Sequence, residues 1–162
     1  GDVAEGDVAR HCRQYEEAIA KAGGIDFQIL GIGRSGHIGF NEPGSSLSSR
    51  TRIKTITRGA RTANARWFGN DVNKVPRTGL TLGVGTIMEA EEVVMVISGF
   101  SKARALQRIL ENEVNHMWTV SMMQLHQHGM IVCDDDATME LKVATVKYFR
   151  DIEKENMALP EF

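Results

Sequence analysis

The spacing of apolar residues predicts an amphipathic helix near the start of the chain. Apolar positions recur every three or four residues over 8–22, which places them on one face of a helix. These residues are Val8, Cys12, Tyr15, Ile19 and Ala22. Asp7 can cap the first turn, and the Gly23-Gly24 pair ends the helix.

Two later segments, 101–111 and one from about Thr138, show the same spacing. Their apolar faces consist of Leu106, Ile109 and Leu110 in the first, and of Met139, Val143, Val146, Phe149 and Ile152 in the second. The acidic run 134–136 stands just before the last helix, where carboxylates interact favourably with the helix dipole. The short stretch 61–68 is also compatible with a helix.

Short apolar runs between these helices predict strands. They cover residues 25–32, 50–57, 79–86, 93–98 and 129–134. The runs 93–98 and 129–134 are nearly continuous in Val, Ile and Met, which indicates strands buried on both faces, as in parallel sheets. Strands that alternate with helices indicate an α/β fold with a mainly parallel sheet. We expect residues 1–162 to belong to one domain.

The order of strands and loops predicts where a ligand would bind. In open α/β sheets, ligands bind beyond the carboxyl ends of the strands. Three loops leave such ends, namely the glycine-rich stretch from Gly31, residues 98–102 and residues 133–136. The stretch "GIGRSGHIGFNEPGSS" after Gly31 therefore lies where a site is expected.

Composition narrows the classes of function. The 162 residues are 42% hydrophobic and carry a formal net charge of −2, which argues against a general nucleic-acid binder. No apolar run approaches the roughly 20 residues that span a bilayer. Cys12 and Cys133 form no CxxC pair, which favours free thiols and a cytoplasmic location.

A literal dinucleotide-binding pattern begins at Gly31, with further glycines at Gly33 and Gly36. That motif requires a helix to start at once and an acidic residue about twenty positions later. Here the segment 41–44, "NEPG", interrupts the chain too early, and residues 50–52 are basic. These two features argue against NAD binding, and the sequence contains no P-loop pattern. We expect no cofactor.

His37 and Glu42 are the best candidates for acid–base chemistry. They lie five residues apart in the glycine-rich loop. Imidazole transfers protons near neutral pH, and a carboxylate can orient it and stabilise its charged form. Alternatively, His37 bonds a backbone carbonyl and Glu42 caps a neighbouring segment. The surrounding glycines favour the functional reading, because they allow the backbone to approach a ligand closely.

Two cations are candidates for binding phosphate. Lys102 stands at the predicted start of a helix, where the dipole disfavours a cation unless an anion is bound. Arg66 lies between apolar residues that would bury its stem, so it could clamp a phosphate or form a structural ion pair. A solvated surface lysine remains the alternative for Lys102.

Two other polar clusters have simpler interpretations. Arg50, Arg52 and Lys54 lie on one face of the strand predicted over 50–57, a pattern typical of a solvated edge, although it could hold an anion. His126 and His128 have no carboxylate or cysteine at suitable spacing nearby, so we expect no metal site.

Nearly the whole chain, from about Cys12 to beyond Arg150, resembles the glucosamine-6-phosphate deaminase (isomerase) family. The likeness includes "GIGRSGHIGFNEPGSSLSSRTRIKT", "TANARWF", "LTLGVGT", "GFSKARALQ" and "CDDDATMELK". It implies a Rossmann-like, three-layer α/β sandwich. It also implies a hydrolase-class enzyme of amino-sugar catabolism that converts glucosamine 6-phosphate and water to fructose 6-phosphate and ammonia without metal or cofactor.

The resemblance also implies roles for individual residues. His37 matches the histidine that opens the sugar ring, with Glu42 as its partner carboxylate. Arg66 and Lys102 match residues that hold the substrate phosphate, and Gly31 matches a backbone contact near the sugar.

A second group matches positions that bind the phosphate of an activator, N-acetylglucosamine 6-phosphate, in regulated bacterial members. These are Ser45, Arg52 and Lys54. The expected partner is thus a small sugar phosphate. Because members of the family often form oligomers, the resemblance also implies a homo-oligomer for the full-length protein.

Two departures from the family pattern affect these expectations. The family loop usually reads Asp-Gly-His, whereas Ser35 precedes Gly36 and His37 here. The family's N-terminal part, with a Ser-Gly-Gly phosphate loop and a catalytic aspartate, has no counterpart before Cys12. We therefore expect an incomplete sheet and an inactive isolated chain. A 6-phosphogluconolactonase-like hydrolase and a non-catalytic sugar-phosphate sensor remain alternatives, and Ser35 favours the sensor.

Overall fold

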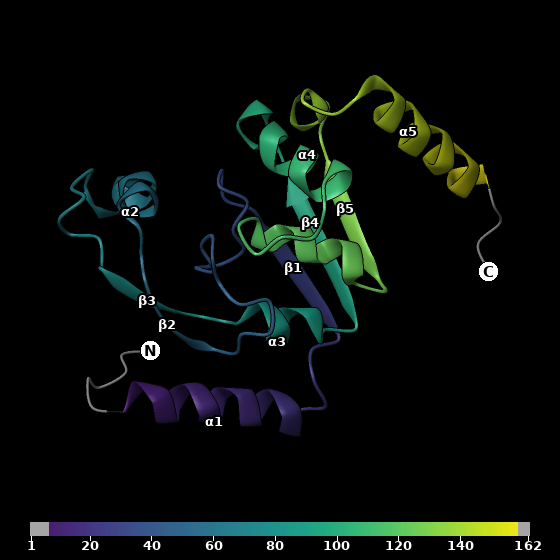
Figure 1. Ribbon diagram of the computed structural model, residues 1–162. Helices are drawn as coiled ribbons and strands as arrows, with labels where there is room; N and C mark the ends of the chain where they lie inside the picture. Colours follow the sequence, from purple (N-terminus) through teal and green to yellow (C-terminus); the bar gives the residue numbers. More distant parts are fainter. Residues whose placement is uncertain (1–6, 159–162) are drawn as a thin grey trace.

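A parallel sheet lies at the centre of the computed structural model, which describes residues 7–158 (Figure 1). It consists of β1 (Phe27–Gly31), β4 (Glu92–Ile97) and β5 (Gly129–Cys133), in the order β1-β4-β5. Both neighbouring pairs are parallel. The α/β fold and the parallel arrangement are confirmed.

The core lies on one face of this sheet. Helices α3 (Val84–Met88), α4 (Ala103–Glu111) and the 3-10 helix η3 (Thr119–Leu125) cover that face (Figure 1). The side chains that fill it include Val93, Met95, Ile97, Leu106, Ile109 and Val120. Residues 101–111 were expected to be helical, and the 3-10 helix η2 (Phe100–Lys102) followed by α4 confirms this.

The opposite face of the sheet is exposed, which corrects the expectation that the strands are buried on both faces. Ile29 is 64% exposed and Met130 is 59% exposed. Phe27, Val96 and Val132 are exposed on the same strands. Successive side chains of a strand point to opposite faces, and the described helices pack against only one of them. These strands therefore carry more apolar side chains than residues 7–158 bury.

A second, antiparallel pair of strands forms an arm beside the sheet. Strand β2 (Arg52–Thr55) pairs with β3 (Thr78–Thr81), and α2 (Arg58–Asn64) and the 3-10 helix η1 (Ala65–Phe68) lie between them in sequence (Figure 1). The run 79–86 is thus not one strand. Gly83 lies against the carbonyl of Ser49, where a Cβ would collide, and Ser49 accepts from the amides of Val84 and Gly85, at 3.1 and 2.9 Å, where α3 begins.

Helix α1 (Val8–Lys21) begins after Asp7 as predicted, but Asp7 makes no capping hydrogen bond. Its carboxylate pairs instead with Arg10, at 3.3 Å. Cys12 is the buried residue of the helix, whereas Tyr15 is exposed. The predicted apolar face is therefore only partly covered.

The last helix, α5 (Val143–Ala158), begins later than the expected start near Thr138. The 3-10 helix η4 (Asp136–Thr138) comes first, and Leu141 then packs against the core. The carboxylate of Glu111 fixes the start of α5, because it accepts hydrogen bonds from the amide of Lys142 and the hydroxyl of Thr145, at 2.8 and 2.7 Å. Every residue of α5 is at least partly exposed, and the helix extends away from the sheet (Figure 1).

Candidate active site

The three loops singled out by the strand order meet at one edge of the sheet. Gly31 pairs with Val96, and Ile97 pairs with Cys133, so all three strands end together. The glycine-rich stretch, the Ser98–Lys102 segment and the segment after Cys133 leave from these ends. The three loops therefore lie together at the edge where ligands of open α/β sheets bind.

Backbone contacts shape the glycine-rich loop around His37. The amide of Gly33 donates to the carbonyl of His37 at 2.9 Å, and the amide of Gly36 donates to the carbonyl of Gly33 at 3.0 Å. A Cβ on Gly33 would overlap the imidazole ring. Glycine at this position therefore allows the ring to lie against the backbone.

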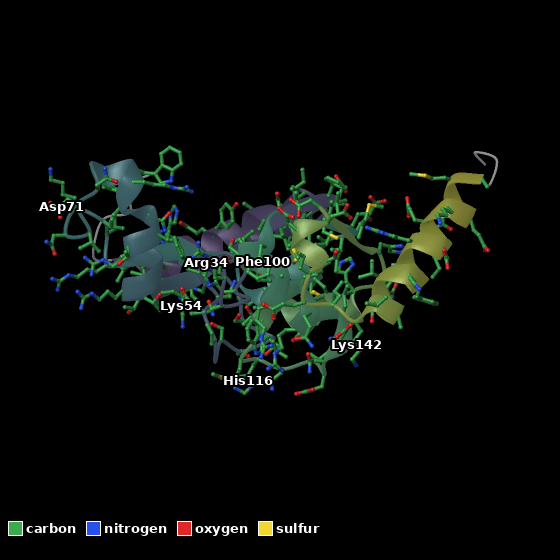
Figure 2. The ribbon with its side chains drawn as sticks, turned by 90° about the horizontal axis from the view of Figure 1, so that it is seen from above. Arg34, Lys54, Asp71, Phe100, His116 and Lys142 are labelled. Carbon is green, nitrogen blue, oxygen red and sulfur yellow. The ribbon has the colours of Figure 1, made fainter. Side chains whose placement is uncertain are left out.

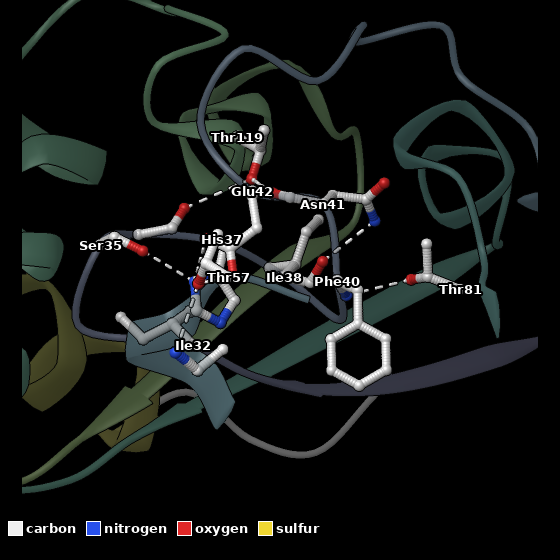
Figure 3. Close-up of polar contacts among 12 residues, drawn as sticks. Ile32, Ser35, His37, Ile38, Phe40, Asn41, Glu42, Thr57, Thr81 and Thr119 are labelled. Carbon is white, nitrogen blue, oxygen red and sulfur yellow. Dashed lines mark hydrogen bonds and ion pairs between the residues drawn. The ribbon is translucent and has the colours of Figure 1, made fainter. Parts of the chain in front are cut away.

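His37 faces two oxygen groups through the same ring nitrogen (Figure 3). Its Nδ1 lies 2.7 Å from Oγ of Ser35 and 3.3 Å from Oε2 of Glu42. The side chains of His37 and Glu42 are 20% and 12% exposed, respectively. His37 thus contacts both Glu42, its expected partner, and Ser35, which stands in place of an expected aspartate, and the His37–Glu42 pair is largely shielded from water.

This geometry defines which nitrogen is available for chemistry. A carboxylate accepts hydrogen bonds, so the tautomer with the proton on Nδ1 is the one that suits Glu42, while the hydroxyl of Ser35 can pair with either tautomer. In the neutral ring, Nε2 is then the unprotonated nitrogen and can act as a base. The arrangement can accept and return one proton at Nε2 while Glu42 stabilises the charged ring.

Thr57 supports Glu42 and was not identified from the sequence. Its hydroxyl donates to Oε1 of Glu42 at 3.3 Å and accepts from the amide of Ala60 at 3.2 Å, which caps α2. Glu42 therefore lies between the loop and the start of α2. A threonine before a helix indicates a cap, but no pattern in the sequence reveals its second partner.

Asn41 is a second residue that sequence reasoning missed. It is fully buried, and its Nδ2 donates to the carbonyls of Ile38 and Leu82 at 3.0 and 2.8 Å. The backbone carbonyl of Asn41 accepts from Oγ1 of Thr119 at 2.8 Å (Figure 3). The residue next to Glu42 in sequence is thus fixed from three directions, which restrains the catalytic loop.

Lys102 reaches the same edge from the β4 side. Its Nζ donates to the carbonyl of Ile32 at 2.6 Å, just after β1. Burial, followed by the positive charge of Arg34, holds the pKa of the Lys102 amino group below its usual range. The ammonium group therefore lies at the base of the glycine-rich loop, where a bound anion would stabilise its positive charge.

Arg66 lies elsewhere, on η1 in the arm. Its guanidinium stands over the ring of Trp67, at 5.1 Å from the centroid. Among the described residues, no hydrogen bond or ion pair joins Arg66 to Lys102 or His37. The expectation that its apolar neighbours bury its stem is wrong, because Trp67 and Phe68 are themselves exposed.

The predicted activator residues lie in the glycine-rich loop, which holds Ser45, and on β2, which holds Arg52 and Lys54. Ser45 is buried, and its Oγ has no hydrogen-bond partner within the described chain. Arg52 is part-buried and donates to Oδ1 of Asn41 at 2.9 Å, and burial lowers the pKa of its guanidinium. Lys54 lies on the side of the molecule that carries the arm (Figure 2). The solvated-edge interpretation is therefore wrong for Arg52, which points inward.

The remaining polar candidates have local partners. Nε2 of His126 bonds the carbonyl of Ala90 at 2.9 Å, and its Nδ1 accepts from the amide of His128 at 3.1 Å. Within residues 7–158, no group of three His, Cys, Asp or Glu side chains could hold a metal ion. Cys12 and Cys133 are free thiols. No helix in the described part of the chain is long and apolar enough to cross a bilayer.

Residues 2–133 match the family model described as glucosamine-6-phosphate isomerases/6-phosphogluconolactonase. The chain is 60% identical over 151 residues to the glucosamine-6-phosphate deaminase of Phocaeicola vulgatus, which covers 93% of this chain and 57% of that protein. The deaminase of Erwinia tasmaniensis is 57% identical with the same coverage. The chain thus spans about 57% of the length of these curated relatives.

Solved structures agree with the fold. A monomeric glucosamine-6-phosphate deaminase superposes with a TM-score of 0.78 at 41% identity, over 82% of this chain and 54% of that chain. The 6-phosphogluconolactonase of Trypanosoma brucei superposes with a TM-score of 0.60 at 17% identity, over 88% and 57%. The second likeness concerns the fold alone. The high-identity relatives are named as deaminases and the family model as isomerases, and these names do not support the expected hydrolase class.

Proposed function

Because the chain belongs to the glucosamine-6-phosphate isomerase/6-phosphogluconolactonase family, we propose that it carries the acid–base half of a glucosamine-6-phosphate deaminase. The whole activity converts glucosamine 6-phosphate and water to fructose 6-phosphate and ammonia. The observation that carries this proposal is the contact of Nδ1 of His37 with Glu42, at 3.3 Å, in a largely buried loop. This contact leaves Nε2 as the base.

In this proposal His37 opens the sugar ring. Nε2 accepts the proton of the anomeric hydroxyl as the ring C–O bond breaks, and the proton is delivered to the ring oxygen that departs. Glu42 orients the imidazole and stabilises its protonated form between the two transfers. Thr57 keeps the carboxylate in place through its bond to Oε1.

The substrate phosphate is assigned to Lys102 and Arg66. Support is stronger for Lys102, whose ammonium lies beside the loop that holds His37. Arg66 stands on η1 in the arm, and no described contact joins it to Lys102, so its assignment rests on the resemblance alone. Each charge-assisted contact to a phosphate contributes roughly 1.5 to 3 kcal/mol in principle.

Two alternatives remain in competition. A 6-phosphogluconolactonase shares the fold, but relatives of 55% identity or more carry the deaminase name. A non-catalytic sugar-phosphate sensor is favoured by Ser35, which stands at the sequence position where the family loop usually has an aspartate and whose hydroxyl lies 2.7 Å from Nδ1. Homo-oligomerisation, a cytoplasmic location and the activator role of Ser45, Arg52 and Lys54 stay predictions.

Grafting tests the proposal directly. The chain would replace the matching segment of the Phocaeicola vulgatus deaminase, so that the rest of that relative supplies its remaining length. Ammonia release from glucosamine 6-phosphate and hydrolysis of 6-phosphogluconolactone would then be measured side by side, with the unmodified relative as the control.

We expect the graft to release ammonia and to leave the lactone intact. Lactone hydrolysis without ammonia release would support the lactonase. Sugar-phosphate binding with neither reaction would support the sensor.

A further inference from the structure

A single carboxylate ties together two of the loops at the sheet edge. Asp134 follows β5 directly, and its carboxylate accepts from Oγ of Ser98 at 2.5 Å and from the amide of Gly99 at 2.9 and 3.0 Å. It also accepts from the amide of Ala137 at 2.9 Å, at the start of η4. These donors come from the β4 loop and from the β5 loop.

The bonds to Ser98 and Gly99 fix the turn that leads to Lys102. Gly99 has φ +83°, a conformation that glycine adopts readily, and its carbonyl accepts from the amide of Lys102 at 3.0 Å. Lys102 then reaches back to the carbonyl of Ile32. A continuous path of contacts therefore runs from Asp134 through the turn to the ammonium group.

The neighbouring acidic residues are differently placed. Asp135 points outward and pairs with Arg150 of α5 at 2.5 Å, with its side chain 88% exposed. Asp134 is also exposed to water, but the hydroxyl of Ser98, followed by the amides of Gly99 and Ala137, holds the pKa of its carboxyl below the usual range. Within the run 134–136, the Asp134 carboxylate thus bonds backbone amides of two loops, whereas the Asp135 carboxylate forms a surface ion pair.

We propose that Asp134 is a positioning residue for the phosphate-binding Lys102, acting through the turn at Ser98 and Gly99. The inference rests on the proposed function, because it assigns to that turn the task of presenting Lys102 to the phosphate of a sugar phosphate. Asp134 itself does not touch the ligand. Its negative charge would repel a phosphate, and its carboxylate oxygens are engaged by the hydroxyl of Ser98 and the amide of Gly99.

The test measures binding of glucosamine 6-phosphate by calorimetry to the graft described above, in a His37→Ala background that prevents turnover. The variants are Asp134→Asn, the milder Ser98→Ala, Lys102→Ala and the double variant Asp134→Asn/Lys102→Ala. Asp135→Asn is the control, because it makes the same charge change one residue away. Circular dichroism checks that each variant is folded, and amide hydrogen exchange at Gly99 reports the order of the turn.

Loss of one charge-assisted phosphate contact should weaken binding by about tenfold or more in Lys102→Ala. We expect a similar loss in Asp134→Asn, faster exchange at Gly99, and no change in Asp135→Asn. If Asp134 acts through Lys102, the double variant should bind no more weakly than Lys102→Ala alone.

Two results would overturn the proposal: wild-type affinity in Asp134→Asn, or losses that simply add in the double variant. Failure of the proposed function looks different. In that case the graft would not bind glucosamine 6-phosphate at all, whereas faster Gly99 exchange in Asp134→Asn would still show that Asp134 holds the turn.

Discussion

At the scale of single residues, the candidate site depends on short polar side chains that hold the loop. His37 and Glu42 form the reactive pair, but Thr57 and Asn41 determine where Glu42 lies. Ser35 adds a hydroxyl beside Nδ1 at 2.7 Å. The spacing of His37 and Glu42 in a glycine-rich loop predicted their contact, whereas Thr57 and Asn41 bond segments distant in sequence, which no local pattern reveals.

Ser35→Asp tests the consequence of the missing carboxylate. A hydroxyl cannot carry negative charge, so in the wild type Glu42 alone stabilises protonated His37. Since an acid–base partner contributes about 10²- to 10⁴-fold in rate, we expect Ser35→Asp in the graft to release ammonia faster. Ser35→Ala is the control and should not accelerate the reaction. An unchanged or lower rate in Ser35→Asp would contradict this role.

Asn41→Leu tests the support beneath the loop. Leucine has a similar volume, but it removes the side-chain amide that donates to the carbonyls of Ile38 and Leu82 and accepts from Nη1 of Arg52. Buried groups that lose a partner cost about 1 to 3 kcal/mol, so we expect a loss of that order in the free energy of unfolding, measured in urea. The exposed Asn73→Leu serves as control and should change it by less than about 0.5 kcal/mol. Equal stability of the two variants would refute the claim.

At the scale of elements, a single acidic side chain attaches α1 to the rest of the molecule. Oε1 of Glu16 accepts from the amide and hydroxyl of Thr51, at 2.7 and 2.5 Å, and from the hydroxyl of Thr86 at 2.7 Å. Burial raises the pKa of Glu16, but these bonds and the charge of Arg50 outweigh it, so the pKa is lowered overall. A groove of about 970 Å³ remains between α1 and β2.

This attachment should weaken in acid. A carboxyl whose pKa is lowered by folding stabilises the protein above its unfolded pKa, near 4.5, and that contribution is lost as the pH falls through the folded value. We expect Glu16→Gln to reduce the free energy of unfolding by about 1 to 3 kcal/mol at pH 7. The difference from wild type should shrink below about pH 4.5. Urea titrations at several pH values measure it.

The exposed Glu17→Gln is the matched control and should show little difference at any pH. A Glu16→Gln deficit that stays constant from neutral to acid pH would mean that the ionised carboxylate does not hold α1.

Sequence patterns identified most elements because each has its own periodicity, as in α1, α4 and the parallel strands. They failed where tertiary contacts decide the outcome. The run 79–86 alternates apolar residues with glycine and threonine, yet β3 ends at Thr81, and Ser49 accepts hydrogen bonds from the amides of Val84 and Gly85 where α3 begins. Likewise, the apolar spacing begins near Thr138, but α5 begins only at Val143, next to the hydrogen bond that Glu111 accepts from the amide of Lys142.

At the scale of the whole molecule, the sheet has one covered face and one exposed apolar face. The exposed side chains are Phe27, Ile29, Val96, Met130 and Val132. Contiguous apolar surface of this kind is typical of interfaces, or of proteins that associate. The chain spans about 57% of the length of its curated relatives, and none of the described residues covers this face.

The chain by itself should therefore associate. We expect sedimentation velocity to show concentration-dependent association at micromolar concentrations, and Ile29→Lys/Val132→Lys to suppress it, because charges on an apolar sheet face oppose stacking. Met117→Lys, an equally exposed position away from the sheet, is the control and should associate like wild type. A wild-type chain that stays monomeric at all concentrations would contradict the prediction.

The central claim is that His37, held by Glu42, is the base of a glucosamine-6-phosphate deaminase. The most direct measurement is the rate of ammonia release from glucosamine 6-phosphate by the graft, compared between wild type and His37→Ala. The account predicts that His37→Ala lowers the rate by about 10²-fold or more, because it removes the acid–base group, while the graft stays folded. Wild-type ammonia release by a folded His37→Ala graft would contradict it.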